Sequence, residues 1–241
     1  MKTLLDLPRL GSQPDAPFPP PGLALAVPNG LLAWGGDLQP DRLLSAYRQG
    51  IFPWYTEGQP VLWWSPAPRC VILPGDVYLS TRTRRRHNSG RYRLTADQAF
   101  EDVIRSCAQP RDYDSGTWIT GDMLQAYVQL HHLGHAHSVE VWEDSRLAGG
   151  IYGLAIGRAF FGESMFSRQV DASKIALLAL CRQLEDWSFG LLDCQVSNPH
   201  LLRMGAVELP RTEFLERLTK LVADPGNPGS WSGKFSTGLR W

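Results

Sequence analysis

The chain has 241 residues, and its 24 basic and 24 acidic side chains give a formal net charge of zero. Hydrophobic residues make up 43% of it, which is enough to build a packed core. No apolar run approaches the length of a membrane span and no signal peptide opens the chain, so a membrane protein is excluded and a cytoplasmic one is expected. The four cysteines form no Cys-x-x-Cys pair and are expected to be reduced and buried.

Residues 1–68 predict a small N-terminal α+β domain that begins with a proline-rich arm. Asp41 is positioned to cap a short helix over 42–49. Two short strands are expected over 61–66 and 70–73, because prolines interrupt an otherwise apolar run there.

The run from Val77 to Ala96 contains no acidic residue, which makes it the clearest charge asymmetry in the chain. It is either a solvated helix face or a phosphate-binding surface, since arginine forks match phosphate oxygens. The arginines proposed for phosphate contact are Arg82, Arg84, Arg85 and Arg86. Core-spaced apolar residues predict that the next segment, 94–108, is a helix with Thr95 at its cap.

From residue 138 the apolar pattern changes to the alternation typical of strands. The expected elements are strands at 138–142, 147–156 and 159–166, a helix at 174–187, a strand at 191–196 and a helix at 199–204. They predict a larger domain over 69–222, with a mixed, mainly antiparallel sheet flanked by helices, followed by a loosely ordered tail over 223–241. The fold class is therefore α+β.

This order of elements resembles the N-acetyltransferase superfamily. In that fold a glycine-rich turn between a strand and the long helix cradles the phosphates of acyl-coenzyme A. The corresponding turn here, 167–172, contains no glycine, so ordinary coenzyme A binding is not expected.

Two carboxylates, Glu163 and Asp193, interrupt apolar strand sequence, where an unpaired charge is costly to bury. Asp193 and Gln195 are two residues apart on an expected strand, so both should face one side while Cys194 faces the core. These polar side chains are therefore candidates for chemistry rather than packing.

Several motifs in fixed order carry a more specific resemblance. They are Gly30-Leu31-Leu32-Ala33, Gly35-Gly36-Asp37-Leu38, Gly50-Ile51-Phe52-Pro53-Trp54, Leu62-Trp63-Trp64-Ser65-Pro66, Gly116-Thr117-Trp118-Ile119-Thr120, Leu133-Gly134-His135-Ala136-His137-Ser138, Gly162-Glu163-Ser164-Met165-Phe166-Ser167 and Asp193-Cys194-Gln195-Val196. Together they closely resemble the bacterial leucyl/phenylalanyl-tRNA–protein transferases, over roughly residues 17–220.

The resemblance implies transfer of Leu or Phe from aminoacyl-tRNA (Leu-tRNA or Phe-tRNA) to proteins whose N-terminal residue is Arg or Lys. Met is left open as a third donor. The modification would mark its target for N-terminus-dependent degradation. The reaction is aminolysis of an ester, which runs downhill to an amide, so no ATP, metal or other cofactor is expected. A monomer is expected.

The resemblance also implies that Asp193 and Gln195 are catalytic. A free α-amine has a pKa of about 8, so a proton must leave it at neutral pH. In one account Asp193 carries the negative charge and orients Gln195, whose carbonyl holds the attacking amine. In the other the pair only positions the substrates, and orientation supplies most of the acceleration.

The remaining site residues are assigned to substrate binding. Glu163 is expected to bind polar groups of the substrate or the basic N-terminal residue of the acceptor. The apolar pocket for the transferred side chain is predicted to contain Phe160, Met165, Ile151 and Leu177. Aromatic rings stack on bases, and Trp54, Trp118 and Tyr47 are the candidates for the terminal adenosine. The site would then lie between the two domains.

Other functions fit the sequence less well. An acyl-coenzyme A-dependent N-acetyltransferase would need the missing glycine-rich turn. A non-catalytic RNA-binding protein would retain the arginine run but leave Asp193 and Gln195 without a purpose. His131 and His135 are four residues apart on an expected helix, but no carboxylate or thiol nearby completes a zinc site.

Overall fold

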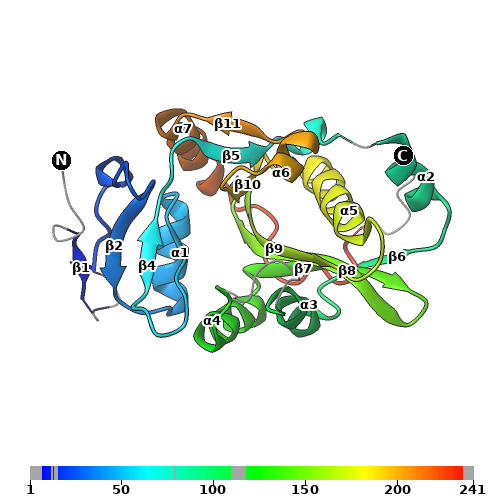
Figure 1. Ribbon diagram of the computed structural model, residues 1–241, viewed down its shortest axis with the longest axis horizontal. Coiled ribbons are helices and arrows are strands. Elements are labelled where there is room, and N and C mark those ends of the chain that lie inside the picture. Colours follow the sequence, from blue (N-terminus) through cyan, green and yellow to red (C-terminus); the bar gives the residue numbers. More distant parts are fainter. Residues whose placement is uncertain (1–6, 12, 14–15, 79, 110–117, 236–241) are drawn as a thin grey trace.

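The computed structural model describes residues 7–11, 13, 16–78, 80–109 and 118–235. Two sheets with packed helices form an α+β fold, which confirms the predicted class (Figure 1). Within these residues no helix is both long and apolar enough to cross a membrane.

The smaller sheet lies near the N-terminus and has four strands. Its order is β1 (Arg9–Leu10), β2 (Leu31–Gly35), β4 (Leu62–Trp64) and β3 (Phe52–Pro53). A short 3-10 turn (Pro21–Leu23) and helix α1 (Pro40–Arg48) accompany it. Gln39 rather than Asp41 occupies the cap of α1, and Asp41 lies in the first turn, because Pro40 starts the helix earlier than expected.

The larger sheet has seven strands and begins at Arg69. Its order is β11 (Val207–Leu209), β5 (Arg69–Ile72), β10 (Leu191–Gln195), β9 (Ala159–Ser167), β8 (Arg146–Ile156), β7 (Ala136–Glu143) and β6 (Arg93–Ala96). Strands β9 and β10 run parallel and their other neighbours are antiparallel, so the sheet is mixed and mainly antiparallel as predicted.

Helices cover both faces of this sheet (Figure 1). Helix α5 (Ala172–Asp186) packs on one face, and α3 (Phe100–Cys107) and α4 (Gly121–His132) pack on the other. The buried residues of α5 include Leu177, Leu180 and Leu184, at the three-to-four-residue spacing of a packed helix face. A 3-10 turn (Pro74–Asp76) and the helices α2 (Thr81–Asn88), α6 (Pro199–Arg203) and α7 (Arg211–Val222) complete the fold.

The single helix predicted over 94–108 is wrong. Strand β6 pairs with β7 along Arg93–Ala96, and helix α3 starts only at Phe100. Asp97 separates the two with a left-handed backbone (φ 56°). Thr95 donates its hydroxyl to the buried Glu140 instead of capping a helix, so a tertiary contact overrode the local periodicity.

The tail was expected to be loosely ordered, and up to residue 235 the structure contradicts this. Trp231 is fully buried and stacks on His137, with ring centroids 3.9 Å apart. The backbone N–H of Trp231 donates to Asp97 at 2.7 Å. A large aromatic ring can close the core in this way even when glycine, proline and serine surround it in sequence. Residues 236–241 lie outside the described part.

One of the two buried hydrophobic clusters contains residues of both sheets. Helix α1 of the N-terminal part contacts α4, α7 and β8, and its Leu43 and Tyr47 belong to the same buried cluster as Phe161. Tyr47 is thereby carried to β9, in the larger sheet, where it contacts Phe161 edge-on. This contact brings residues from both parts of the chain to the candidate site.

Candidate functional site

Glu163 lies at an irregularity in strand β9. Tyr152 pairs with Ser164 and Gly153 pairs with Gly162, so Glu163 is an extra residue with no partner on β8. Such a β-bulge bends its strand and interrupts the ladder, and Glu163 lies on the same side as Phe161, toward Tyr47. The bulge therefore explains why an acidic residue occurs within an otherwise apolar strand.

The carboxylate of Glu163 receives hydrogen bonds from three elements. Tyr47 on α1 donates to Oε1 at 2.7 Å, Tyr127 on α4 donates to Oε2 at 3.0 Å, and Gln195 Nε2 at the end of β10 donates to Oε1 at 2.9 Å. The hydroxyls of Tyr47 and Tyr127 also bond to each other. Tyr127 was not among the residues predicted from the sequence, because it belongs to an ordinary amphipathic helix.

The number of protons available for hydrogen bonding in this cluster favours the protonated form of Glu163. The contacts between Glu163, Tyr47 and Tyr127 form a closed triangle, but the two hydroxyls supply only two protons for its three sides. A proton on Glu163 completes the triangle. Burial, partly opposed by the hydrogen bonds from Tyr47 and Tyr127, raises the pKa of Glu163 to about 7.

The two tyrosines stay neutral in this environment. Burial raises the pKa values of Tyr47 and Tyr127 well above their usual range, and the charge of Glu163 adds to the effect. Glu163 is therefore the group in the cluster that changes charge near neutral pH.

Gln195 also lies at an irregularity. Asp193 pairs with Val71 and Gln195 pairs with Cys70, so Cys194 is an extra residue on β10, and Gln195 has a left-handed backbone (φ 65°). Cys194 packs against the buried cluster that contains Cys70 and Leu192, as expected for a side chain that faces the core. Cys194 is half-buried and lines a pocket.

Asp193 is fully buried and pairs with Arg69 of β5. Its Oδ1 accepts from Arg69 Nε at 2.8 Å and from the backbone N–H of Gln195 at 2.9 Å, while its Oδ2 accepts from Arg69 Nη2 at 2.7 Å. This fork-to-fork pair neutralises the carboxylate and holds the backbone of Gln195 in its left-handed turn.

Arg69 was not among the predicted site residues. It is itself fully buried, donates to the carbonyl of Gly50 at 3.1 Å, and lies between the rings of Phe52 and Phe214. The signal was present in the sequence, since a lone arginine inside the apolar run 69–73 needs a buried partner as much as Asp193 does.

A pocket of about 170 Å³, here called the apolar pocket, opens where the pairing of β9 and β10 ends. Four predicted residues line it, namely Glu163, Met165, Ile151 and Leu177. Leu192, Cys194, Asn198 and Leu201 are among the other lining residues. The pocket therefore combines apolar walls with the Glu163 cluster at its edge.

Two predicted substrate contacts lie elsewhere. Phe160 is 1% exposed and does not line the pocket, because it is fully enclosed in the core against Trp231, in the same buried cluster as Ile151 and Leu177. Tyr47 is fully buried beside Glu163 and has no open face on which a base could stack.

The tryptophans proposed for base stacking lie on the N-terminal side of the site. Trp54 is 43% exposed and contacts Trp64, while Trp118 is half-buried against the core. A hydrogen bond between Tyr55 and Thr120 holds the segments that carry them together. Neither tryptophan lines the apolar pocket, so stacking by these rings stays a prediction.

The four arginines of the basic run lie on α2 and divide into two groups. Arg82, Arg84 and Arg85 are exposed. Arg86 is half-buried and pairs with Asp171, which begins α5. The first three are therefore placed to contact a solvent-borne partner, whereas Arg86 fastens α2 to α5.

Of the two histidines considered for zinc, His135 lines a separate pocket beside Arg48 and Gly134, and His131 has a structural role, as does His137. His131 contacts the carbonyl of Ala136 at 2.8 Å and stacks on Phe100, while His137 contacts Asp97 at 2.9 Å. In the part of the chain that the structure describes, no group of three His, Cys, Asp or Glu side chains could hold a metal ion.

Models of one protein family match most of the chain. The leucyl/phenylalanyl-tRNA protein transferase model matches residues 71–219, and the model of the N-terminal domain of the same family matches residues 36–67. The protein is thus an aminoacyltransferase. It belongs to the leucyl/phenylalanyl-tRNA–protein transferase family, which confirms the resemblance carried by the motifs.

Curated relatives agree along nearly their whole length. A leucyl/phenylalanyl-tRNA–protein transferase of Nitrosomonas europaea is 54% identical over 92% of this chain and 94% of its own. Another, of Xanthomonas euvesicatoria pv. vesicatoria, is 56% identical over 94% of this chain and 91% of its own.

Solved structures are far more remote. A GCN5-related N-acetyltransferase from Kribbella flavida is 10% identical over 71% of this chain and 61% of its own, with a TM-score of 0.39. L-PGS from Bacillus licheniformis is 9% identical over 71% of this chain and 57% of its own, with a TM-score of 0.38. Structural similarity at TM-scores this low supports no conclusion about function.

Proposed function

We propose that the protein transfers Leu or Phe from aminoacyl-tRNA to the α-amino group of proteins that begin with Arg or Lys. The observation that carries the proposal is the hydrogen bond between Glu163 and Gln195 at the edge of the apolar pocket. In this proposal Glu163 serves as the proton acceptor and Gln195 as the amine-binding group, beside a pocket for an apolar side chain. Family membership supplies the donor class.

The transferred side chain occupies the apolar pocket. Ile151, Leu177 and Leu192 give it fixed walls, and Met165 adds a flexible one. A thioether side chain adapts its shape easily, so the pocket takes either a branched aliphatic group or an aromatic ring, and the unbranched side chain of Met as a third donor.

Gln195 holds the attacking amine. Its Nε2 donates to Glu163, which fixes the orientation of the amide and directs the carbonyl oxygen to an incoming N–H donor. Gln195 is thereby a catalytic residue through contact with the amine, although its amide is too weakly basic to remove a proton.

Glu163 accepts the proton that the amine loses. A base whose pKa is about 7 is well matched to neutral pH. The amine nitrogen attacks the ester carbonyl carbon, the bond from that carbon to the ribose oxygen breaks, and the proton held by Glu163 passes to that oxygen. The products are a peptide bond and a tRNA with a free ribose hydroxyl.

Asp193 acts as a positioning residue. Its carboxylate is buried and paired with Arg69, so it acts through the Gln195 backbone that it holds and through its charge, which helps to raise the pKa of Glu163. This separates the two residues first assigned together, with Gln195 in contact with substrate and Asp193 behind it.

The preference for Arg or Lys at the acceptor terminus rests on the family resemblance and on Glu163, the acidic residue among those lining the apolar pocket. The product would carry a destabilising N-terminus and enter N-terminus-dependent degradation. The exposed Arg82, Arg84 and Arg85 would hold phosphates of the tRNA body, a contact that positions RNA without reading its sequence.

The test uses radiolabelled leucyl-tRNA and three forms of one acceptor protein, which begin with Arg, Lys or Ala. Label is expected on the first two and absent from the third. No label on any acceptor would refute the transfer, and equal labelling of all three would refute the acceptor preference. Uncharged tRNA mixed with free labelled Leu serves as the control.

A further inference from the structure

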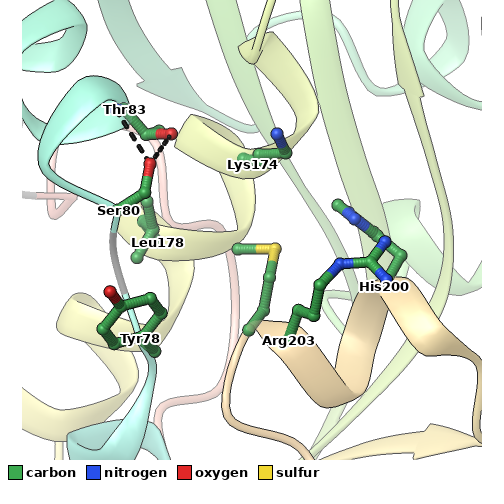
Figure 2. Close-up of a pocket in the computed structure, with 8 residues that line it drawn as sticks. Tyr78, Ser80, Thr83, Lys174, Leu178, His200 and Arg203 are labelled. Carbon is green, nitrogen blue, oxygen red and sulfur yellow. Dashed lines mark hydrogen bonds between the residues drawn. The ribbon is translucent and has the colours of Figure 1, made fainter.

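A second pocket lies across α5 and α6 from the apolar pocket, and the proposed function leaves it without an occupant. Its volume is about 230 Å³, and it is here called the cationic pocket. Lys174 comes from α5, and His200 and Arg203 come from α6. Figure 2 shows these side chains on one side of the pocket and Tyr78, Ser80 and Thr83 on the other.

The charge of this pocket is positive. None of its eight lining residues, all within the described part of the chain, is acidic. Asp171 is the nearby carboxylate, and it already accepts from both Lys174 and Arg86, so one negative charge faces two positive ones. Arg203 is exposed and adds a further positive charge.

The pKa of His200 also indicates that the electrostatic potential of this pocket is positive. Burial lowers the pKa of His200, and the charges of Lys174 and Arg203 lower it further. Cations gathered from two helices, with no anion among the lining residues, favour a negatively charged ligand. The hydroxyls of Tyr78 and Ser80 complete a wall of groups that can donate to its oxygens.

The position of the pocket indicates which anion it takes. On α6, Leu201 and the capping residue Asn198 face the apolar pocket, while His200 and Arg203 face the cationic pocket. On α5, Leu177 lines the apolar pocket and Lys174 lines the cationic pocket. The two pockets are therefore neighbours that share two helices.

Helix α2 continues the cationic surface beyond the pocket. Ser80 caps this helix and lines the pocket, and the exposed Arg82, Arg84 and Arg85 follow directly on the same helix. A polyanion whose end lies in the apolar pocket would cross the cationic pocket on its way to these arginines.

We propose that the cationic pocket binds a backbone phosphate of the single-stranded 3′ end of the aminoacyl-tRNA, through Lys174, His200 and Arg203. The proposal rests on the proposed function, because the ester must lie in the apolar pocket. A phosphate here fixes the 3′ end next to the site of aminolysis, so the ester arrives in position.

The test compares donors with and without phosphates. Leucyl esters of adenosine, of the dinucleotide CpA, of the trinucleotide CpCpA and of whole tRNA are given to the unmodified protein and to Lys174→Gln/Arg203→Gln. The matched control is Arg217→Gln/Lys220→Gln, which removes the same charge from the exposed face of α7.

Lys174→Gln/Arg203→Gln is expected to lower kcat/KM at least about tenfold for the donors that carry the bound phosphate, because the variant cannot form the charge-assisted hydrogen bonds. Transfer from leucyl-adenosine is expected to be unchanged, which also shows that the variant is folded. The control is expected to match the unmodified protein with every donor.

In a second measurement, the slope of log binding constant against log salt for tRNA should shrink by about 0.7 for each phosphate that the variant no longer binds. An unchanged slope, an equal fall in kcat/KM with leucyl-adenosine, or a fall seen only with whole tRNA would each overturn the assignment. Absence of transfer by the unmodified protein from every donor would instead refute the proposed function.

Discussion

A carboxyl group with a pKa of about 7 changes charge at ordinary cellular pH, and Glu163 is such a group. Its state decides whether the cluster can accept a proton from the acceptor amine. Tyr47 and Tyr127 keep the carboxyl in place, and Gln195 donates to it and is the residue that we propose binds the acceptor amine. The proposed chemistry therefore depends mainly on the protonation state of one side chain, which lies at a β-bulge.

Glu163→Gln should reveal this role in the pH profile. The unmodified enzyme needs the ionised carboxylate, so kcat/KM should rise with pH through about 7 and level off above it, apart from the ionisation of the acceptor amine near pH 8. In the variant the limb near pH 7 should vanish and the rate should fall about 10²- to 10⁴-fold.

The matched control is Glu213→Gln, which alters an exposed carboxylate on α7 and should leave the profile intact. A variant that kept the limb near pH 7 would show that another group titrates there.

The buried ion pair between Arg69 and Asp193 is the second feature at the scale of single residues. Asp193→Asn or Arg69→Met leaves one polar group buried without its partner and should cost about 3–5 kcal/mol, measured by denaturant unfolding. Arg69→Met/Asp193→Leu should recover much of that stability but still show a lower kcat, because Gln195 loses its support. Recovery of full kcat by the double variant would contradict the positioning role of Asp193. The exposed pair Arg91–Glu143 provides a comparison, and breaking it should have little effect on the unfolding free energy because solvent screens the two charges.

At the scale of elements, the bulges in β9 and β10 create the site. Beyond the pair Asp193 and Phe161 these parallel strands are no longer in register, and the apolar pocket lies between them. Opposite the first bulge, Gly153 of β8 has no room for a side chain. An added Cβ would meet the carbonyl of Phe161 and lie 2.6 Å from the Phe160 ring.

Gly153→Ala should therefore displace the strand that carries Glu163. Overpacking of this kind costs about 1–3 kcal/mol, and we expect kcat to fall together with the thermal midpoint. Gly121→Ala, where a Cβ meets nothing within 4 Å, is the control and should change neither. A normal kcat in Gly153→Ala would show that the geometry of the bulge is not needed for catalysis.

Helix α2 is the element proposed to hold the tRNA body. Arg82→Gln/Arg84→Gln/Arg85→Gln should reduce the salt slope of tRNA binding by about 0.7 to 0.9 for each arginine that contacts a phosphate. The control replaces Arg105, Arg182 and Arg217, which form exposed ion pairs within their own helices. Equal slopes in the two triple variants would refute the contact.

At the scale of the whole molecule, distant segments close both the core and the site. Helix α1 brings Tyr47 to Glu163 across the boundary between the sheets, and the segment after α7 returns to cover His137 with Trp231. Activity and stability therefore depend on parts of the chain outside the larger sheet.

Trp231→Ala tests the second closure. Removing a fully buried tryptophan should cost about 3–5 kcal/mol of unfolding free energy, while Trp231→Phe should cost less. Trp54→Ala, at a ring that is 43% exposed, is the control for stability. A thermal midpoint unchanged in Trp231→Ala would mean that the packed tail contributes nothing to the fold.

The sequence alone determined the family, the α+β class, the order of strands and helices between residues 138 and 204, and the candidacy of Glu163, Asp193 and Gln195, whereas strand β11 was not predicted. Hydrophobic periodicity acts within a few residues, so it can be read locally. Motifs in fixed order identified the family without any geometry.

Only the tertiary structure decided what those polar residues do. Bulges at Glu163 and Cys194 interrupt the strand pairing, which no local pattern reveals, and Arg69 neutralises Asp193 from a strand far away in sequence. The pKa of Glu163 is raised because distant segments exclude water from around it. Burial and pairing depend on what packs from elsewhere in the chain, and that is fixed by the whole fold.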